Sequence, residues 1–151
     1  MIKDPLLEKI HKNARTGLFT VPKVRGMASD RRFRQELSIQ ETEYRNLYAA
    51  AEELNGGQAA QIGTFAKLRT SMMIRISGDD TSKLAQMMLL GSTMGIVDVT
   101  RALKQHPEAP KASKALSEDF LAAQERNVEV LKQYLLFPQF DPHCHADLFL
   151  H

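Results

Sequence analysis

The amino-acid sequence predicts an all-α protein built as a four-helix bundle. Four long segments carry apolar residues at the three-and-four spacing of a helix, and turns rich in proline or glycine separate them. No segment shows the sustained alternation of a half-buried strand. Four helices with one apolar stripe each most simply bury those stripes against one another. The 151 residues are expected to form one such domain over 1–137, followed by a C-terminal extension over 138–151.

The first two helices are expected on either side of a short turn. Asp4 caps the first helix, and Pro5 takes its first position, where a missing N–H costs nothing. Pro22 lies inside the same apolar pattern and is expected to kink this helix or to end it about a turn early. Asp30 caps the second helix, which the Asn-Gly-Gly after Leu54 ends.

The second pair of helices follows a longer connection. Residues 61–77 are basic and amphipathic, which predicts a short helical connector. The third long helix is expected over 82–105 and the fourth over 112–136, with two prolines in the turn between them. The long connection favours two helical hairpins joined by a crossover. The predicted core stripe of the third helix comprises Leu84, Met87, Met88, Gly91, Met94, Gly95 and Ala102.

Charge and cysteine content limit the partners and the compartment. The net charge of +2 is too small to require nucleic acid or an anionic membrane as a partner. No apolar run approaches the roughly 18 residues that indicate a membrane span. The single Cys144 excludes an internal disulfide, and the N-terminus lacks the apolar run of a signal peptide, so we expect a cytoplasmic protein.

Each predicted stripe carries polar residues near its centre. They are Asn13 in the first helix, Gln40 flanked by Glu41 and Tyr44 in the second, Asp98 in the third, and Gln124 and Asn127 in the fourth. A buried polar group without a partner costs about 1–3 kcal/mol, so we expect these side chains to bond to one another or to water in one layer. The sequence separations from Asn13 to Gln40 and from Asp98 to Gln124 are nearly equal, as if the two hairpins repeated one scheme.

This arrangement resembles the ferritin-like superfamily, in which each hairpin supplies one Glu from its first helix and a Glu-x-x-His pair from its second to hold two metal ions. On this resemblance, Asn13 and Asp98 take the places of the first-helix Glu, and residues 40–43 and 124–127 take those of the Glu-x-x-His pairs. The segment GSTMGIVDVTRALKQHP is also similar to a segment of small bacterial ferritin-like proteins. The resemblance covers residues 4–136 and implies the bundle with its long crossover.

The ligand set departs from the superfamily pattern. Asn and Gln replace acidic residues, neither pair keeps its His, and neutral amides are weaker donors to a hard metal ion than carboxylates. Asp98 is the charged residue expected at the centre, and Glu41 or Glu43 joins it if the second helix turns slightly. We therefore expect no di-iron chemistry and no resident cofactor, and instead a hydrogen-bonded network that sets the helix register.

Two further motifs carry weaker expectations. His143, Cys144 and His145 gather metal-ligand types in the C-terminal extension, but a structural zinc site needs four ligands, so this tail binds metal only with help from elsewhere. Gly91 and Gly95 form a G-x-x-x-G on the third helix, which is expected to let two backbones approach closely.

Two functions are compatible with these expectations. The favoured one is a non-catalytic bundle that acts by association, either as a homo-oligomer such as a dimer or with another protein. The alternative is a metal- or small-ligand-binding protein that takes iron or another divalent metal at the bundle centre. Its site would be Asp98, Glu41, Glu43 and Tyr44.

Overall fold

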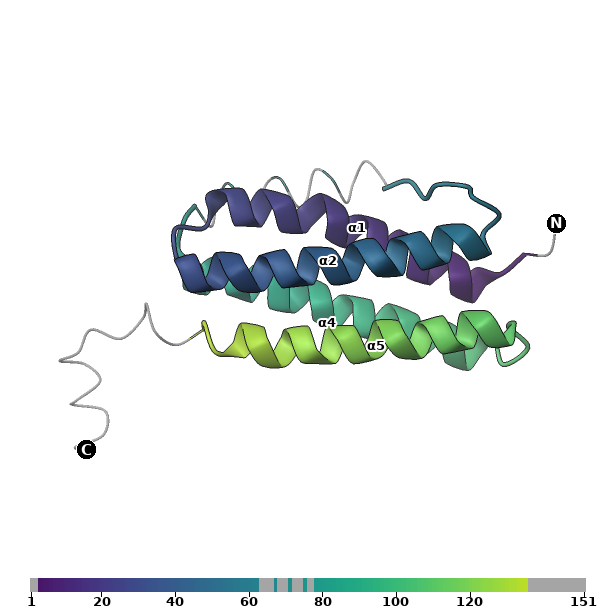
Figure 1. Cartoon of the computed structure of the whole chain (residues 1–151). Coiled ribbons are helices and arrows are strands. Elements are labelled where there is room, and N and C mark those ends of the chain that lie inside the picture. Colours follow the sequence, from purple (N-terminus) through teal and green to yellow (C-terminus); the bar gives the residue numbers. More distant parts are fainter. Residues whose placement is uncertain (1–2, 63–66, 68–70, 72–74, 76–77, 136–151) are drawn as a thin grey trace, which may run out of the picture.

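The computed structural model describes residues 3–62, 67, 71, 75 and 78–135 (Figure 1). These residues form four long helices and no strand, which confirms the predicted all-α class. The helices are α1 (Pro5–Met27), α2 (Arg31–Leu54), α4 (Thr81–Gln105) and α5 (Lys111–Lys132). Lys67, Ser71 and Arg75 are also helical, whereas the rest of the predicted connector from residue 63 to 77 and the extension over 138–151 lie outside the described residues.

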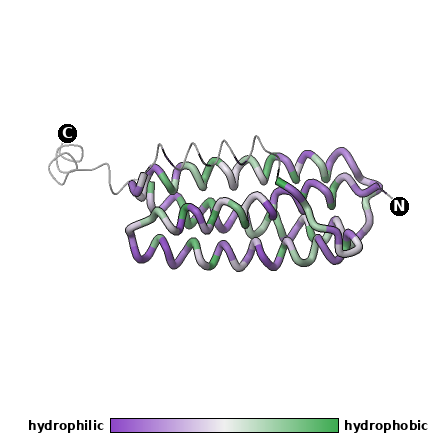
Figure 2. Tube along the Cα trace, turned by 90° about the horizontal axis from the view of Figure 1, so that it is seen from above, coloured by the Kyte–Doolittle hydropathy of each residue, from purple (hydrophilic) through white to green (hydrophobic). Residues whose placement is uncertain are grey.

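The helices pack as an elongated bundle. Helix α1 lies along α2 and α4 lies along α5, and each pair is joined by a short turn at one end (Figure 1). Helix α2 also packs on α5, and α1 packs on both α4 and α5. Hydrophobic and hydrophilic stretches alternate along each helix in Figure 2, as expected for helices with one buried face.

Aspartates cap three of the helices. Asp4, Asp30 and Asp80 each accept a hydrogen bond from the backbone N–H three residues further on, at distances of 2.7–3.1 Å. Helix α4 begins at Thr81, one residue before the predicted start at 82, because Asp80 caps it. Helix α5 begins after Pro110 and has no side-chain cap. It ends at Lys132, four residues before the predicted end, because the next residues form a turn.

Pro22 does not end α1, contrary to one of the two outcomes expected for it. The helix continues through Pro22 to Met27. A proline inside a helix costs about 3 kcal/mol because it removes one backbone hydrogen bond and crowds the preceding turn. Val21 and Val24 on either side are fully buried, and their burial in the core offsets this cost.

The predicted stripe of α4 is wrong at some positions of its second half. Gly91 and Met94 are exposed and Asp98 is only partly buried, whereas Ser92 and Val99 are buried in their place. Gly95 and Ala102 are buried as predicted. Leu84, Gly95 and Ala102 stay on the stripe, so the observed stripe is turned by less than one residue, or less than 100°. The cause lies in the sequence, because residues 84–97 contain no charged residue that would mark the solvent side. The apolar spacing there fits two phases of the helix about equally well.

The core contains polar as well as apolar side chains. Phe33 and Phe120 are its largest fully buried residues, and Gln40 and Gln124 are also among the largest. None of the described helices is long and apolar enough to cross a membrane.

Candidate functional site

Tyr44 of α2 lies at the polar centre of the bundle. Its ring is buried, and its hydroxyl donates a hydrogen bond to Oε1 of Gln124 on α5 at 2.9 Å. Burial raises the pKa of Tyr44 above its ordinary value of 10.0, and the hydrogen bond with Gln124 opposes that rise. Gly17 of α1 makes room for the ring, because a Cβ atom at this position would lie 2.5–2.6 Å from three ring carbons.

Several neighbouring polar side chains are buried without a partner. The side chains of Ser92 and Asn127 lie next to the Tyr44 hydroxyl. Ser92 Oγ, Asn127 Nδ2 and both side-chain polar atoms of Gln40 have no hydrogen-bond partner among the described residues. The structure therefore buries Gln40, Tyr44, Gln124 and Asn127 as predicted, and the bond from Tyr44 to Gln124 joins α2 to α5 within the expected layer.

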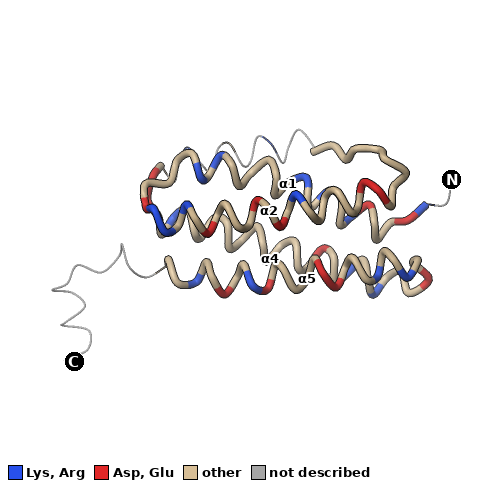
Figure 3. The backbone as a smooth tube through the Cα atoms, viewed as in Figure 1, with Lys and Arg blue, Asp and Glu red and all other residues tan. Residues whose placement is uncertain are grey.

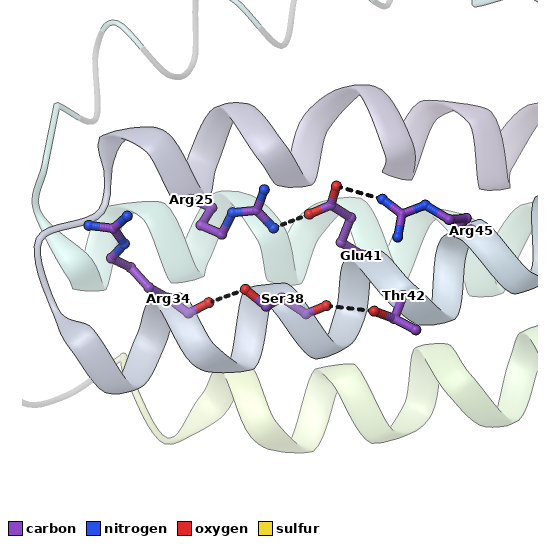
Figure 4. Close-up of polar contacts among 6 residues, drawn as sticks. All are labelled: Arg25, Arg34, Ser38, Glu41, Thr42 and Arg45. Atoms are coloured by element: carbon purple, nitrogen blue, oxygen red, sulfur yellow. Dashed lines mark hydrogen bonds and ion pairs between the residues drawn. The ribbon is translucent and has the colours of Figure 1, made fainter.

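The two candidate acidic ligands on α2 are neutralised by arginines. The Glu41 carboxylate is buried between Arg25 of α1, which donates to its Oε2, and Arg45, whose Nη2 lies 3.1 Å from its Oε1 (Figure 4). Glu43 pairs with Arg126 of α5 at 2.9 Å and stays partly exposed. Both carboxylates thus have cationic partners in place of a metal ion.

Asp98 and Asn13 are not fully buried, contrary to the sequence prediction. Asp98 is only partly buried and lies beside the buried stripe of α4, because the helix is turned by less than one residue from its predicted phase. Asn13 is also only partly buried, and its Nδ2 donates to the backbone oxygen of Lys9 in the same helix, at 2.9 Å. Asn13 lines the cleft between α1 and α4 together with Tyr44 and Gln124, whereas Asp98 is not among the residues of that cleft.

No metal centre forms within the part of the chain that the structure describes. Its His, Cys, Asp and Glu side chains make no group of three or more that could hold an ion. His143, Cys144 and His145 lie outside the described residues, so the expectation of a metal-binding tail stays a prediction.

His11 is a buried polar residue that the sequence analysis missed. Its ring packs against Tyr48 with a centroid distance of 4.7 Å, and its Nε2 atom has no partner among the described residues. Burial lowers the pKa of His11 below 6.5, and the Glu52 carboxylate opposes this shift. The spacing gave a signal, because His11 lies between Leu7 and Ala14 on the stripe of α1.

A small cleft opens between α1 and α4 above this polar centre. Its volume is about 70 Å³, and Tyr44 and Gln124 line its inner end. Gly91, one of the two glycines of the predicted close-packing motif, lines the cleft and would place a Cβ in open space. Gly95 is buried, with a Cβ position 3.3 Å from the Phe120 ring, so it contacts an aromatic side chain of α5 and not a neighbouring backbone.

The fold and this centre define a four-helix bundle with buried polar side chains at its centre. Comparison of the chain with known proteins finds no match among family models, curated proteins or solved structures. Function must therefore be inferred from the side chains described above and from the surface that they leave exposed.

Proposed function

We propose that this chain is a ferritin-like four-helix bundle that acts by association with a second copy of itself through the outer face of α4. The ferritin-like arrangement is supported by two tightly packed helix pairs, each with a short turn, and by the long connection between α2 and α4. The pairing of Glu41 and Glu43 with arginines supports a bundle without a metal pair.

The exposed side of α4 carries the proposal. Leu90, Met94 and Val97 are 49%, 45% and 47% exposed, and their spacing places them in one row along the helix. Fourteen successive residues between Lys83 and Asp98 carry no charge, and Figure 3 shows no charged residue along the middle of α4. A helix at the surface of a monomer normally has charged residues on its outer side, so this face has the composition of an interface.

The uncharged character of the face favours a second copy of the same chain as the occupant. In a two-fold dimer, the same patch lies on both subunits and each residue meets its own kind or a near neighbour. Charged side chains would repel one another across such an interface unless their positions were complementary. A row of Leu, Met and Val meets itself without this penalty and loses apolar surface to the partner.

The test is the sedimentation velocity of the chain and of two lysine variants. The parent is expected to sediment as a dimer at micromolar concentration. The double variant Leu90→Lys and Val97→Lys is expected to be a monomer with unchanged helical circular dichroism, because two charges would be buried in the interface. The matched control is Ile39→Lys, which changes an isolated residue of α2 that is 56% exposed, and it should leave the dimer intact. A monomeric parent, or a double variant that still dimerises, contradicts the proposal.

A further inference from the structure

The cleft between α1 and α4 is a second feature of the bundle, distinct from the exposed row on α4. Residues of α1 and α4 form its sides, and Tyr44 of α2 and Gln124 of α5 close its inner end, so all four described helices contribute to it. Its volume of about 70 Å³ is roughly half of the ~150 Å³ of an engineered apolar cavity that binds benzene. The space therefore suits a body of only a few carbon atoms.

The lining of the cleft is uncharged. Met87, Met88 and Phe120 supply apolar surface, and Tyr44, Ser92 and Gln124 supply hydroxyl and amide groups. The absence of a charged side chain among the lining residues makes the cleft unfavourable for an ion, because an unpaired charge loses its hydration on entry. An uncharged molecule enters without that penalty.

Ser92 indicates which polar group the cleft would recognise. It is only 2% exposed, and its Oγ lacks a partner among the described residues, although the side chain lines the cleft. A serine hydroxyl can donate and accept, and the hydroxyl of Tyr44 beside it still has a free acceptor site after donating to Gln124. A ligand hydroxyl could pair with both groups, since it also donates and accepts.

We propose that this cleft binds a small uncharged molecule with an unbranched apolar body and a hydroxyl head, the head bonding to Ser92 and Tyr44 and the body lying against Met87, Met88 and Phe120. This site is independent of the proposed dimer. It makes no use of the exposed side chains of Leu90 and Val97.

The experiment uses methyl NMR of the full chain labelled at the methionine methyl groups. The methyls of Met87 and Met88 lie in the cleft, and Met27 at the end of α1 is an internal reference. The probes are 1-butanol, butyrate and n-butylammonium, which share a chain length and differ in charge. We expect 1-butanol to shift the Met87 and Met88 signals saturably, with the two ions binding about tenfold or more weakly.

Blocking variants test whether these shifts come from the cleft. Gly91→Leu and Thr20→Leu add bulk from opposite sides, and neither changes the exposed row on α4. The matched control is Gly26→Leu, which also adds a side chain to a helical glycine with open space around it but lies outside the cleft lining. Both blocking variants should weaken 1-butanol binding at least about tenfold, as expected when a pocket is filled, and the control should leave it unchanged.

The remaining variant tests the hydroxyl recognition. Ser92→Ala should lower the affinity for 1-butanol several-fold while the protein stays folded, because the substitution removes a single hydroxyl beside Tyr44 and leaves the Tyr44–Gln124 hydrogen bond in place. The proposal is overturned if 1-butanol leaves Met87 and Met88 unshifted, if the ions bind equally well, or if neither blocking variant weakens binding. An unchanged affinity in Ser92→Ala overturns the assignment of the head group.

Discussion

Replacing Gly17 by alanine should destabilise the bundle, although alanine is the better helix former. The added Cβ would lie 2.5–2.6 Å from Cγ, Cδ1 and Cε1 of Tyr44, whereas ordinary contacts begin near 3.4 Å. The Tyr44 ring must therefore retreat by about 1 Å, a shift of the kind that overpacks a dense core. The ring is buried and its hydroxyl is held by Gln124, so that movement also strains the hydrogen bond at the centre.

The change in the free energy of unfolding is the sum of two losses and one gain. Overpacking costs about 1–3 kcal/mol, and loss of the bond to a buried acceptor costs about 1–3 kcal/mol. The helix propensity of alanine returns about 1 kcal/mol. The expected net loss is about 3 kcal/mol, which should lower the urea midpoint by roughly 1 M or more. Circular dichroism is the suitable signal, because the chain has no tryptophan.

Two comparisons separate this steric effect from helix propensity. Gly26→Ala in the same helix meets open space and should be neutral or stabilising by up to about 1 kcal/mol. In a Tyr44→Ala background the ring is gone, so Gly17→Ala should change sign and become stabilising. If Gly17→Ala is as stable as Gly26→Ala in the parent chain, the close approach of Gly17 and Tyr44 is refuted.

Three further predictions concern the polar groups of the bundle. Tyr44→Phe should cost about 1–3 kcal/mol in urea unfolding, because it leaves Gln124 Oε1 buried without its donor; an unchanged midpoint would mean that water replaces the donor. Glu41→Gln should cost about 1–3 kcal/mol by breaking a largely buried ion pair, whereas Glu8→Gln, which breaks an exposed pair with Lys12, should cost less than about 1 kcal/mol; equal costs would contradict the burial of Glu41. Since burial lowers the pKa of His11 in the folded state, its contribution to stability is complete above pH 6.5 and is lost as the pH falls below that value. The parent should therefore lose more stability than His11→Phe between pH 7.5 and pH 5, and parallel losses would show that His11 is protonated in the folded protein.

Helix limits and most of the polar centre could be predicted from the sequence because their signals are local. Asp4 and Asp30 indicate where helices begin, because each side chain accepts a hydrogen bond from the backbone N–H only three residues further on. Gln40, Tyr44 and Gln124 fall on apolar stripes whose other faces carry many charges, so their inward direction was unambiguous. Charged residues on the outer face are what fix the phase of a helix.

The errors arise where that local signal is weak or where the partner is distant. The sequence predicts a central Asp98 because residues 84–97 lack charges, and two helix phases fit the same apolar spacing. The sequence offers Glu41 as a candidate metal ligand because nothing near it in the sequence reveals its pairing with Arg25. Arg25 belongs to another helix, and only the packing of α1 on α2 brings the two side chains together. The space beside Gly17 that the Tyr44 ring occupies likewise depends on how α1 and α2 are aligned along each other.

The most direct test of association through α4 is a distance between two copies of the chain. A spin label at Arg101→Cys in a Cys144→Ser background lies on the exposed side of α4, one turn beyond Val97. With a rise of 1.5 Å per residue and helices 8–10 Å apart, two α4 helices packed through Val97 and Leu90 should place the labels within about 35 Å of each other. Pulsed electron paramagnetic resonance should therefore record a dipolar coupling between the two labels that corresponds to a distance in this range. A sample at the same concentration with no intermolecular coupling would contradict the account.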